Sequence, residues 1–184
     1  MEKTTGQQLI ESRRSIRLFT DERLETSTLY EILQSAHQAP FHNKTEPWSV
    51  YLFNGEGKQV LLDGLETAFI EGGDAKRAKV TGRIENAAAC LYVTAKQFET
   101  EKGNRDALLA TATFIQNVHL LCAEQKIGLV WRTGALFDDE RLKAWIGAEG
   151  ETFVGLLQLG RFEPEDVPPL KRRQSVDACL TIFE

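Results

Sequence analysis

The sequence predicts an α+β domain in which helices flank a central mixed or antiparallel sheet. Helical patterns come first, and strands alternate with helices from residue 48 onward. The chain has 184 residues, of which 42% are hydrophobic and 27% charged, and this is the balance of a globular protein. Because it contains no repeat, low-complexity tract or linker, we expect a single domain over residues 1–184.

Two helices are expected before the first strand. Residues 6–14 have a short helical pattern, for which Thr5 is the expected N-cap. In residues 26–40, Thr28 and Glu31 have capping-box spacing and Pro40 ends the pattern. The apolar residues of this second segment share one helical face, as expected of a helix that packs on a core: Leu29, Ile32, Leu33 and Ala36.

Four strands are expected in the rest of the chain. Residues 48–53 have strand composition and end at a turn, and residues 87–95 form a continuous apolar run, typical of a strand buried on both faces. Residues 127–136 predict a strand that runs into a glycine-containing turn, and residues 152–160 predict another buried strand.

Helices are expected between these strands. Two helical patterns within residues 57–83 are separated by residues 71–74. Residues 105–125 are apolar on nearly every helical face, which predicts a helix at the centre of a core or in a subunit interface. A short amphipathic helix follows at residues 138–147, with acidic residues favouring its N-terminus.

Composition argues against several classes of function. A net charge of −5 disfavours a general nucleic-acid binder. No apolar run is long enough to span a membrane, and the first residues contain no apolar signal-like stretch, so we expect no membrane association. The three cysteines are far apart and form no CxxC pair, which disfavours structural zinc and suggests a reducing, cytoplasmic location.

The common nucleotide and hydrolase motifs GxGxxG, GxxxxGK[ST] and GxSxG are absent. His37, His42 and His119 have no metal-ligand spacing, and no metal site is expected. We expect His119 to be a core residue with its hydrogen bonds satisfied and Cys122 to be a small buried apolar residue. The acidic residues 138–140 are better explained by the start of a helix than by metal binding.

Three segments remain as candidates for a binding site. In "SRRSIRLF", residues 12–19, three arginines flank Ser15, but basic residues at the end of a helix also complement its dipole. The polar loop at residues 39–48 is either functional or a solvated connection. "WRTGAL", residues 131–136, closes a buried strand with an arginine that suits either a site or a surface ion pair. Together, arginines and a serine suit a phosphate, and Trp131, Thr133 and the His42 loop suit a flat conjugated ring.

"RRSIRLF" followed by "APFHNKTEPWSVYLF" resembles the opening of the nitroreductase-like flavoproteins, whose usual forms are RRSxRxF and an AP…N…QPW loop. "GLVWRTGAL…VGLLQLG" and "PPLKRR" resemble later blocks of the same family, in the same order and spacing. The resemblance is greatest to small bacterial members of about this length. It implies an intertwined α+β homodimer with FMN at the subunit interface, in which residues 105–125 form the central dimer helix and "ACLTIF" an arm on the partner.

The resemblance also implies roles for particular residues. Arg13, Arg14 and Ser15 match the first flavin-binding block, with Arg13 and Ser15 toward the ribityl phosphate and Arg17 near the flavin N1/O2 edge, where positive charge stabilises the reduced ring. Gln38 and His42 match positions contributed by the partner subunit. The remaining matches lie beside the isoalloxazine ring or at the phosphate: Trp131, Arg132 and Thr133, then Lys171 and Arg173.

Two departures from the family pattern affect the expected site. Glu46 stands where the family loop usually carries Gln, and a carboxylate near the flavin disfavours further negative charge. Residues 54–86 are also short compared with larger relatives, which suggests a more open substrate pocket.

The expected function is an FMN-dependent oxidoreductase. By resemblance, it takes hydride from NADH or NADPH at flavin N5 and passes electrons to a small-molecule acceptor such as a nitroaromatic or quinone, in ping-pong fashion. No residue is assigned as a catalytic acid or base. Two alternatives remain open at this point: a non-catalytic FMN-binding sensor or storage protein, and an α+β protein without flavin whose arginines cap a helix.

Overall fold

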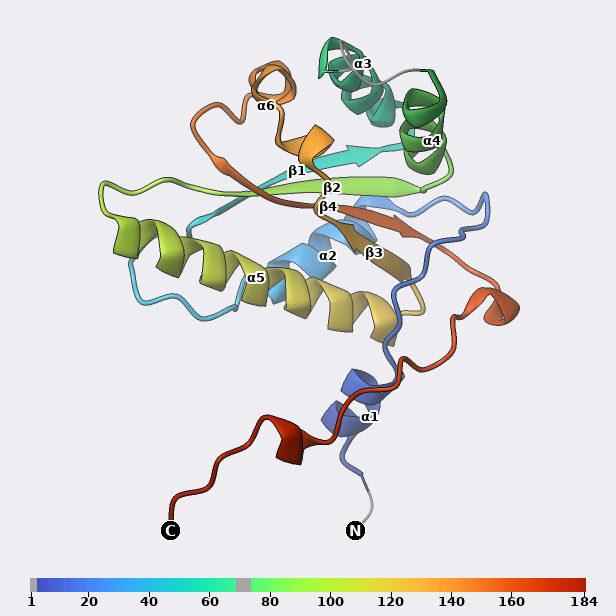
Figure 1. Cartoon of the computed structure of the whole chain (residues 1–184). Helices are drawn as coiled ribbons and strands as arrows, with labels where there is room; N and C mark the ends of the chain where they lie inside the picture. The colour runs from blue at the N-terminus through green and yellow to red at the C-terminus, as the bar shows by residue number, and fades with distance from the viewer. Residues whose placement is uncertain (1–2, 69–73) are drawn as a thin grey trace.

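The structure is a computed structural model that describes residues 3–68 and 74–184. Its centre is a four-stranded sheet in the order β1-β2-β4-β3 (Figure 1). All three neighbouring pairs are antiparallel. The strands lie where the sequence predicts them: β1 Trp48–Asn54, β2 Ala89–Ala95, β3 Gly128–Arg132 and β4 Thr152–Gly160.

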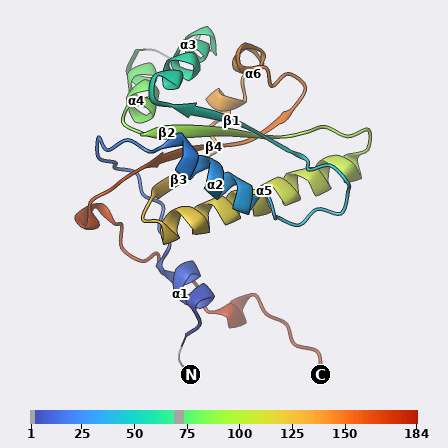
Figure 2. The same ribbon diagram turned by 180° about the vertical axis from the view of Figure 1, so that it is seen from behind.

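One face of the sheet is covered by α2 (Thr26–Ala36) and α5 (Glu101–Glu124), which lie beside each other (Figure 2). Phe114 of α5 stacks on Trp48 of β1, with ring centroids 5.1 Å apart. The sequence of α5 is apolar on nearly every face, but within this chain only one side of the helix is buried. Leu109 is 60% exposed.

The opposite face is covered by α3 (Lys58–Ala68), α4 (Asp74–Glu85) and α6 (Glu140–Ile146). The loop before α6 is anchored to the sheet because the buried Tyr92 hydroxyl donates to the Phe137 carbonyl at 2.5 Å. Asp139 caps α6 by accepting from the Arg141 amide at 2.9 Å, which confirms that acidic residues here serve the helix start. Of the predicted separator between α3 and α4, residues 71–73 lie outside the described residues.

Two predicted helix starts are wrong. Thr4, not Thr5, caps α1 (Thr5–Ser12), and Gln7 completes a capping box with it. Helix α2 begins after Glu25, so Thr28 lies inside the helix and forms no capping box with Glu31. Its start is fixed instead by Asn54 of β1, whose side-chain amide donates to the Leu24 carbonyl at 2.9 Å. The spacing of residues within the helix cannot predict this contact, because Asn54 and Leu24 are 30 residues apart in the sequence.

The chain leaves α1 and runs along the end of the sheet where β3 begins and β4 ends. The Ile16 amide donates to the Leu129 carbonyl at 3.1 Å, and the Thr20 amide donates to the Arg161 carbonyl at 2.9 Å. Ile16 is buried. Residues 16–20 are therefore tied to the sheet at both ends.

The position of residues 16–20 against the sheet depends on the absence of a side chain at Gly160, and an alanine there should displace this segment. A Cβ at Gly160 would lie 2.8 Å from Cβ of Phe19, which is too close for an ordinary contact. We expect Gly160→Ala to lower the free energy of unfolding by roughly 1–3 kcal/mol. Gly82→Ala on α4 is the control, because nothing lies within 4 Å of its added Cβ. Urea unfolding measures both, and equal effects would contradict the close approach.

Candidate functional site

Arg13 lies at the C-cap of α1 and is half-buried. Burial lowers the pKa of Arg13, and the nearby charges of Arg14 and Arg173 lower it further. The structure thus gathers cations from both ends of the chain around one position. Within residues 3–68 and 74–184, no carboxylate lies within ion-pair distance of Arg13. A desolvated guanidinium without a counter-charge is suited to an anion supplied from outside.

Arg14 has a different environment from its neighbour. Its Nη1 donates to the carbonyls of Glu11, Ser12 and Arg13 at 2.7, 2.9 and 2.9 Å. These carbonyls lie at the C-terminal end of α1, so Arg14 satisfies the helix end. The two possibilities left open by the sequence therefore divide between adjacent side chains: the Arg14 guanidinium bonds to the end of the helix, whereas the Arg13 guanidinium makes no such bond.

A second group of arginines lies around Arg132 at the end of β3. Burial lowers the pKa of Arg132, followed by the charges of Arg83 and Arg17. Gln158 of β4, only 1% exposed, accepts from Arg132 Nε and donates from its Nε2 to the Arg83 carbonyl at 3.0 Å. The two ends of one buried amide thus join the end of β3 to the end of α4, and three guanidinium groups share the region.

Sequence reasoning missed Arg83. The sequence signal available was a basic residue in the last turn of a helix, which the helix dipole explains equally well. Its proximity to Arg132 depends on the contact between α4 and Gln158, and residues 83 and 158 are too far apart in the sequence for any local pattern to relate them.

Trp131 and Arg132 project to opposite faces of the sheet, as adjacent strand residues do. The Trp131 ring packs on the α5 side, where its Nε1 donates to the Val154 carbonyl at 3.0 Å. A Cβ at Gly155 would lie 1.9 Å from this nitrogen, so glycine is needed for the indole to lie against β4. The predicted block therefore supplies its arginine to one face and its indole to the other. Thr133 follows the strand and is exposed.

Four further predicted residues differ in their exposure. Ser15 is half-buried between Arg14 and Ile16, whereas Gln38, Lys171 and Arg173 are exposed. Of the two C-terminal cations, only Arg173 affects the pKa of Arg13.

His42 lies far from Arg13 within one chain. It lines a pocket of about 520 Å³ with Asp106 near the start of α5. Arg13 lies by His119, near the end of the same helix. At 1.5 Å per residue, the stretch of α5 between Asp106 and His119 is about 20 Å long. One copy of the chain does not bring these two parts of the predicted site together.

Glu46, the departure from the family pattern, faces a histidine of its own chain. Its Oε1 lies 3.7 Å from Nε2 of His37. Nδ1 of the same ring accepts from Nε1 of Trp48 at 3.1 Å, so the ring proton belongs on Nε2, toward the carboxylate. His37 immediately precedes Gln38, and the carboxylate is therefore held at the end of α2.

Helix α5 carries two buried groups that the sequence singled out. Cys122 is fully buried, and burial raises the pKa of its thiol to about 12, which confirms an inert apolar role. The expectation that His119 is satisfied is wrong. His119 is 6% exposed, and its buried Nδ1 has no hydrogen-bond partner among the described residues. Burial, with a smaller effect from Arg13, lowers the pKa of His119 to about 4, so the ring is neutral at pH 7.

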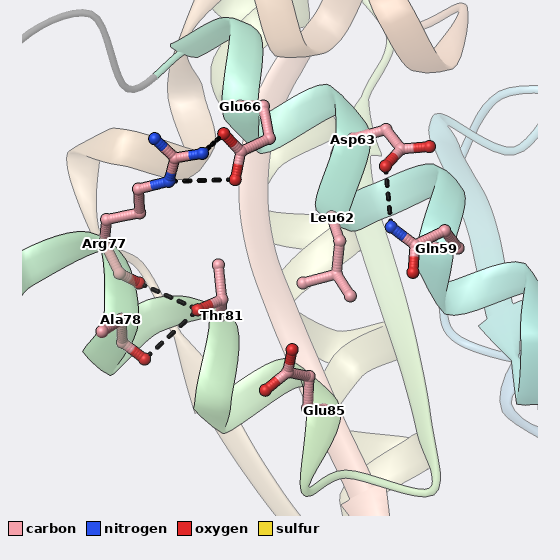
Figure 3. A pocket seen from close by; sticks show the side chains of 8 residues that line it. All are labelled: Gln59, Leu62, Asp63, Glu66, Arg77, Ala78, Thr81 and Glu85. Atoms are coloured by element: carbon pink, nitrogen blue, oxygen red, sulfur yellow. Dashed lines mark hydrogen bonds and ion pairs between the residues drawn. The ribbon is translucent and has the colours of Figure 1, made fainter. Parts of the chain in front are cut away.

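A separate pocket of about 360 Å³ lies between α3 and α4 (Figure 3). Asp63, Glu66 and Glu85 line it together with one cation, Arg77. Arg77 is paired with Glu66, and Asp63 accepts from Gln59 at 2.7 Å. Its negative charge makes this pocket unsuitable for a phosphate.

No group of three potential metal ligands occurs in the described part of the chain, and none of its helices is both long and apolar enough to cross a membrane.

Comparison with known proteins matches residues 10–161 to the nitroreductase family. The chain is 31% identical over 175 residues to "Putative NAD(P)H nitroreductase YfhC" of Bacillus subtilis, covering 91% of this chain and 89% of that one. It superimposes with a TM-score of 0.92 on a nitroreductase-like family protein from Bacillus cereus, at 33% identity and with coverage of 100% and 98%. The FMN-dependent nitroreductase NfnB from Mycobacterium smegmatis, crystallised with NADPH, shares the fold at 16% identity, with a TM-score of 0.77 and coverage of 97% and 98%.

The antiparallel sheet with helices on both faces, together with this superposition, confirms the predicted nitroreductase-like α+β fold, and the predicted intertwined homodimer stays a prediction. The chain belongs to the nitroreductase family.

The buried His119 should make stability depend on pH. Its pKa is about 4 in the folded protein and 6.5 as its ordinary value, so between these values the unfolded chain binds more protons. The free energy of unfolding should therefore fall as pH decreases from 6.5 to 4, by up to about 3 kcal/mol. Urea unfolding of the flavin-free protein in phosphate-free buffer measures this. In His119→Leu the decrease should be smaller by a comparable amount, and an unchanged pH profile would contradict the assignment.

Proposed function

We propose that this protein is an FMN-dependent oxidoreductase of the nitroreductase type that uses NADH or NADPH to reduce a small-molecule acceptor. The observation that carries the proposal is the pair of arginine groups joined by residues 13–17. One group surrounds Arg13, and the other contains Arg17, Arg83 and Arg132. The names of relatives support the same cofactors, since they include an NAD(P)H nitroreductase and an FMN-dependent enzyme in complex with NADPH.

The donor set fits FMN. Arg13 and Arg173 offer guanidinium groups to a phosphate, and the Ser15 hydroxyl, two residues after Arg13, would complete such a site, with Lys171 two residues before Arg173. Arg17, Arg83 and Arg132 place positive charge at a second position, where the edge of a reduced ring would need it. When bound, FMN supplies hydride transfer through its N5.

The residues of this chain bind and orient the cofactor and adjust its electrostatic environment. Gln158 bonds to the Arg132 side chain and to the backbone at the end of α4, so the Arg132 guanidinium is oriented before any ligand arrives. Arg132 is partly desolvated and lies close to the exposed Arg17 and Arg83, so negative charge that develops beside Arg132 would be stabilised more strongly than it would be in water. We assign no residue as a proton donor.

We also propose a homodimer that completes the site. Gln38 and His42 would come from the second copy, because within one chain His42 lies about 20 Å along α5 from the Arg13 group. Apolar side chains exposed on α5 and on the C-terminal segment support such an assembly, since a second copy would cover them: Leu108, Leu109, Leu180, Ile182 and Phe183. The predicted cytoplasmic location stays a prediction.

The direct test is an anaerobic visible spectrum of the purified, FMN-loaded protein before and after NADH or NADPH. Bleaching of the flavin absorbance, followed by reoxidation with a nitroaromatic or quinone, is the expected result. A flavin that binds but is reduced by neither nicotinamide would indicate the non-catalytic alternative. A protein that does not bind FMN at all would leave the arginines without a flavin role.

Adjacent arginines should differ in their effect on FMN. We expect Arg13→Ala to weaken FMN binding by about 10–100-fold, because a charge-assisted contact to the phosphate is lost. Arg14→Ala is the matched control, since its guanidinium is bonded to the end of α1. It should change FMN affinity by less than about 3-fold and mainly loosen the helix. Fluorescence titration with FMN measures the affinity of both variants, and equal losses of affinity would contradict different roles for Arg13 and Arg14.

Arg17 should influence the flavin potential more than FMN affinity. Removing its charge in Arg17→Gln takes away stabilisation of the reduced ring, so the midpoint potential should fall by about 20–60 mV, equivalent to roughly 1–3 kcal/mol for two electrons. Anaerobic redox titration against a reference dye gives the value. Arg23→Gln on the exposed surface is the control, and the same shift in both variants would refute a specific role for Arg17.

A further inference from the structure

His119 and Arg13 form an unusual pair beneath the proposed phosphate site. The Nδ1 atom of His119 is buried without a partner, and neither ring nitrogen makes a hydrogen bond within the described residues. Among the described residues, Arg13 is the one charged group that affects the pKa of His119. Leaving a buried polar atom unpaired costs about 1–3 kcal/mol, so this arrangement requires an explanation.

The chemistry of the two groups identifies the tautomer of His119. A guanidinium has five N–H donors and no acceptor, so a proton on Nδ1 would place two donors against each other. The neutral tautomer with its proton on Nε2 instead leaves the buried Nδ1 as an acceptor, on a helix against which α1 packs and within range of the Arg13 charge. The low pKa of the ring keeps it in this neutral, accepting form at pH 7.

Arg13 has donors to spare. A phosphate takes two of them in a bidentate contact, which leaves N–H groups that point elsewhere. We propose that His119 is a positioning residue: Nδ1 accepts a hydrogen bond from Arg13 in the FMN-loaded protein and so fixes the guanidinium against the phosphate. This inference rests on the proposed FMN site, and it adds a residue to which neither the sequence motifs nor the family resemblance gave a role.

Three substitutions separate this role from packing. Asn places an amide oxygen near the position of Nδ1, Gln places its amide near the position of Nε2, and Leu removes the acceptor while keeping an apolar side chain. We expect His119→Leu and His119→Gln to raise the Kd for FMN about 5–20-fold. His119→Asn should stay within about 3-fold of the wild type. Thermal unfolding of all three verifies that the variants are folded.

Riboflavin, which has the same ring and ribityl chain without the phosphate, is the second probe. If His119 acts through Arg13 on the phosphate, the Kd for riboflavin should change by less than about 2-fold in all three variants. Parallel losses for FMN and riboflavin would show a packing role and overturn the proposal. An unchanged Kd for FMN in the Leu variant would also overturn it.

A double-mutant cycle tests the route of the effect. Because His119 acts on the phosphate through Arg13, Arg13→Ala combined with His119→Leu should bind FMN no more weakly than Arg13→Ala alone, within about 2-fold. Additive losses would refute the positioning role. If the wild type binds neither FMN nor riboflavin, the proposed function fails together with this inference. If it binds FMN normally and only the His119 variants behave otherwise than expected, this inference alone fails.

Discussion

The attachment of residues 16–20 to the sheet is the constraint on which the rest of the site depends. The backbone hydrogen bonds from Ile16 to Leu129 and from Thr20 to Arg161 hold this segment across the start of β3 and the end of β4. Arg13 and Arg17 flank the first of these bonds. One peptide segment thereby directs one arginine toward α5 and another toward Arg132. Because this segment is fixed to the sheet, its two arginines can contact two different parts of one anionic ligand.

The cost of this arrangement is electrostatic. Arg13 and Arg132 are both partly desolvated, and each has other guanidinium groups close by. Neither burial nor like charge favours a cation, so the folded protein holds its arginines in a state that an anion would relieve. The neutral His119 lies beside the same region and adds a buried acceptor without a partner. Such unfavourable groups persist where the surrounding structure fixes them, and they are concentrated at functional sites.

The pair of Glu46 and His37 shows how the fold accommodates a departure from the family pattern. A carboxylate in the loop after α2 is unfavourable near an anionic ligand. Here it faces the protonated nitrogen of His37, whose other nitrogen is held by Trp48. The charge is therefore directed toward the end of α2 within its own chain, next to Gln38.

The sequence by itself determined the order and approximate bounds of the strands and the layered α+β class, and it singled out the arginines proposed for the site except Arg83. These follow from apolar runs, helical spacing and the residue types of short motifs, all of which are local properties of the chain. It missed the cap of α1 by one residue, although Thr4 and Gln7 form a local capping box. It missed the start of α2 because a side chain of β1 fixes that start and local spacing alone suggested Thr28. The residue types alone did not distinguish Arg13 from Arg14, and the family resemblance placed only Arg13 toward the phosphate. The structure distinguished them by the local bonds of Arg14 to the end of α1. Only the tertiary structure brought Arg83 to Arg132 through Gln158 and left Nδ1 of His119 unpaired, because these two features depend on contacts between elements distant in the sequence.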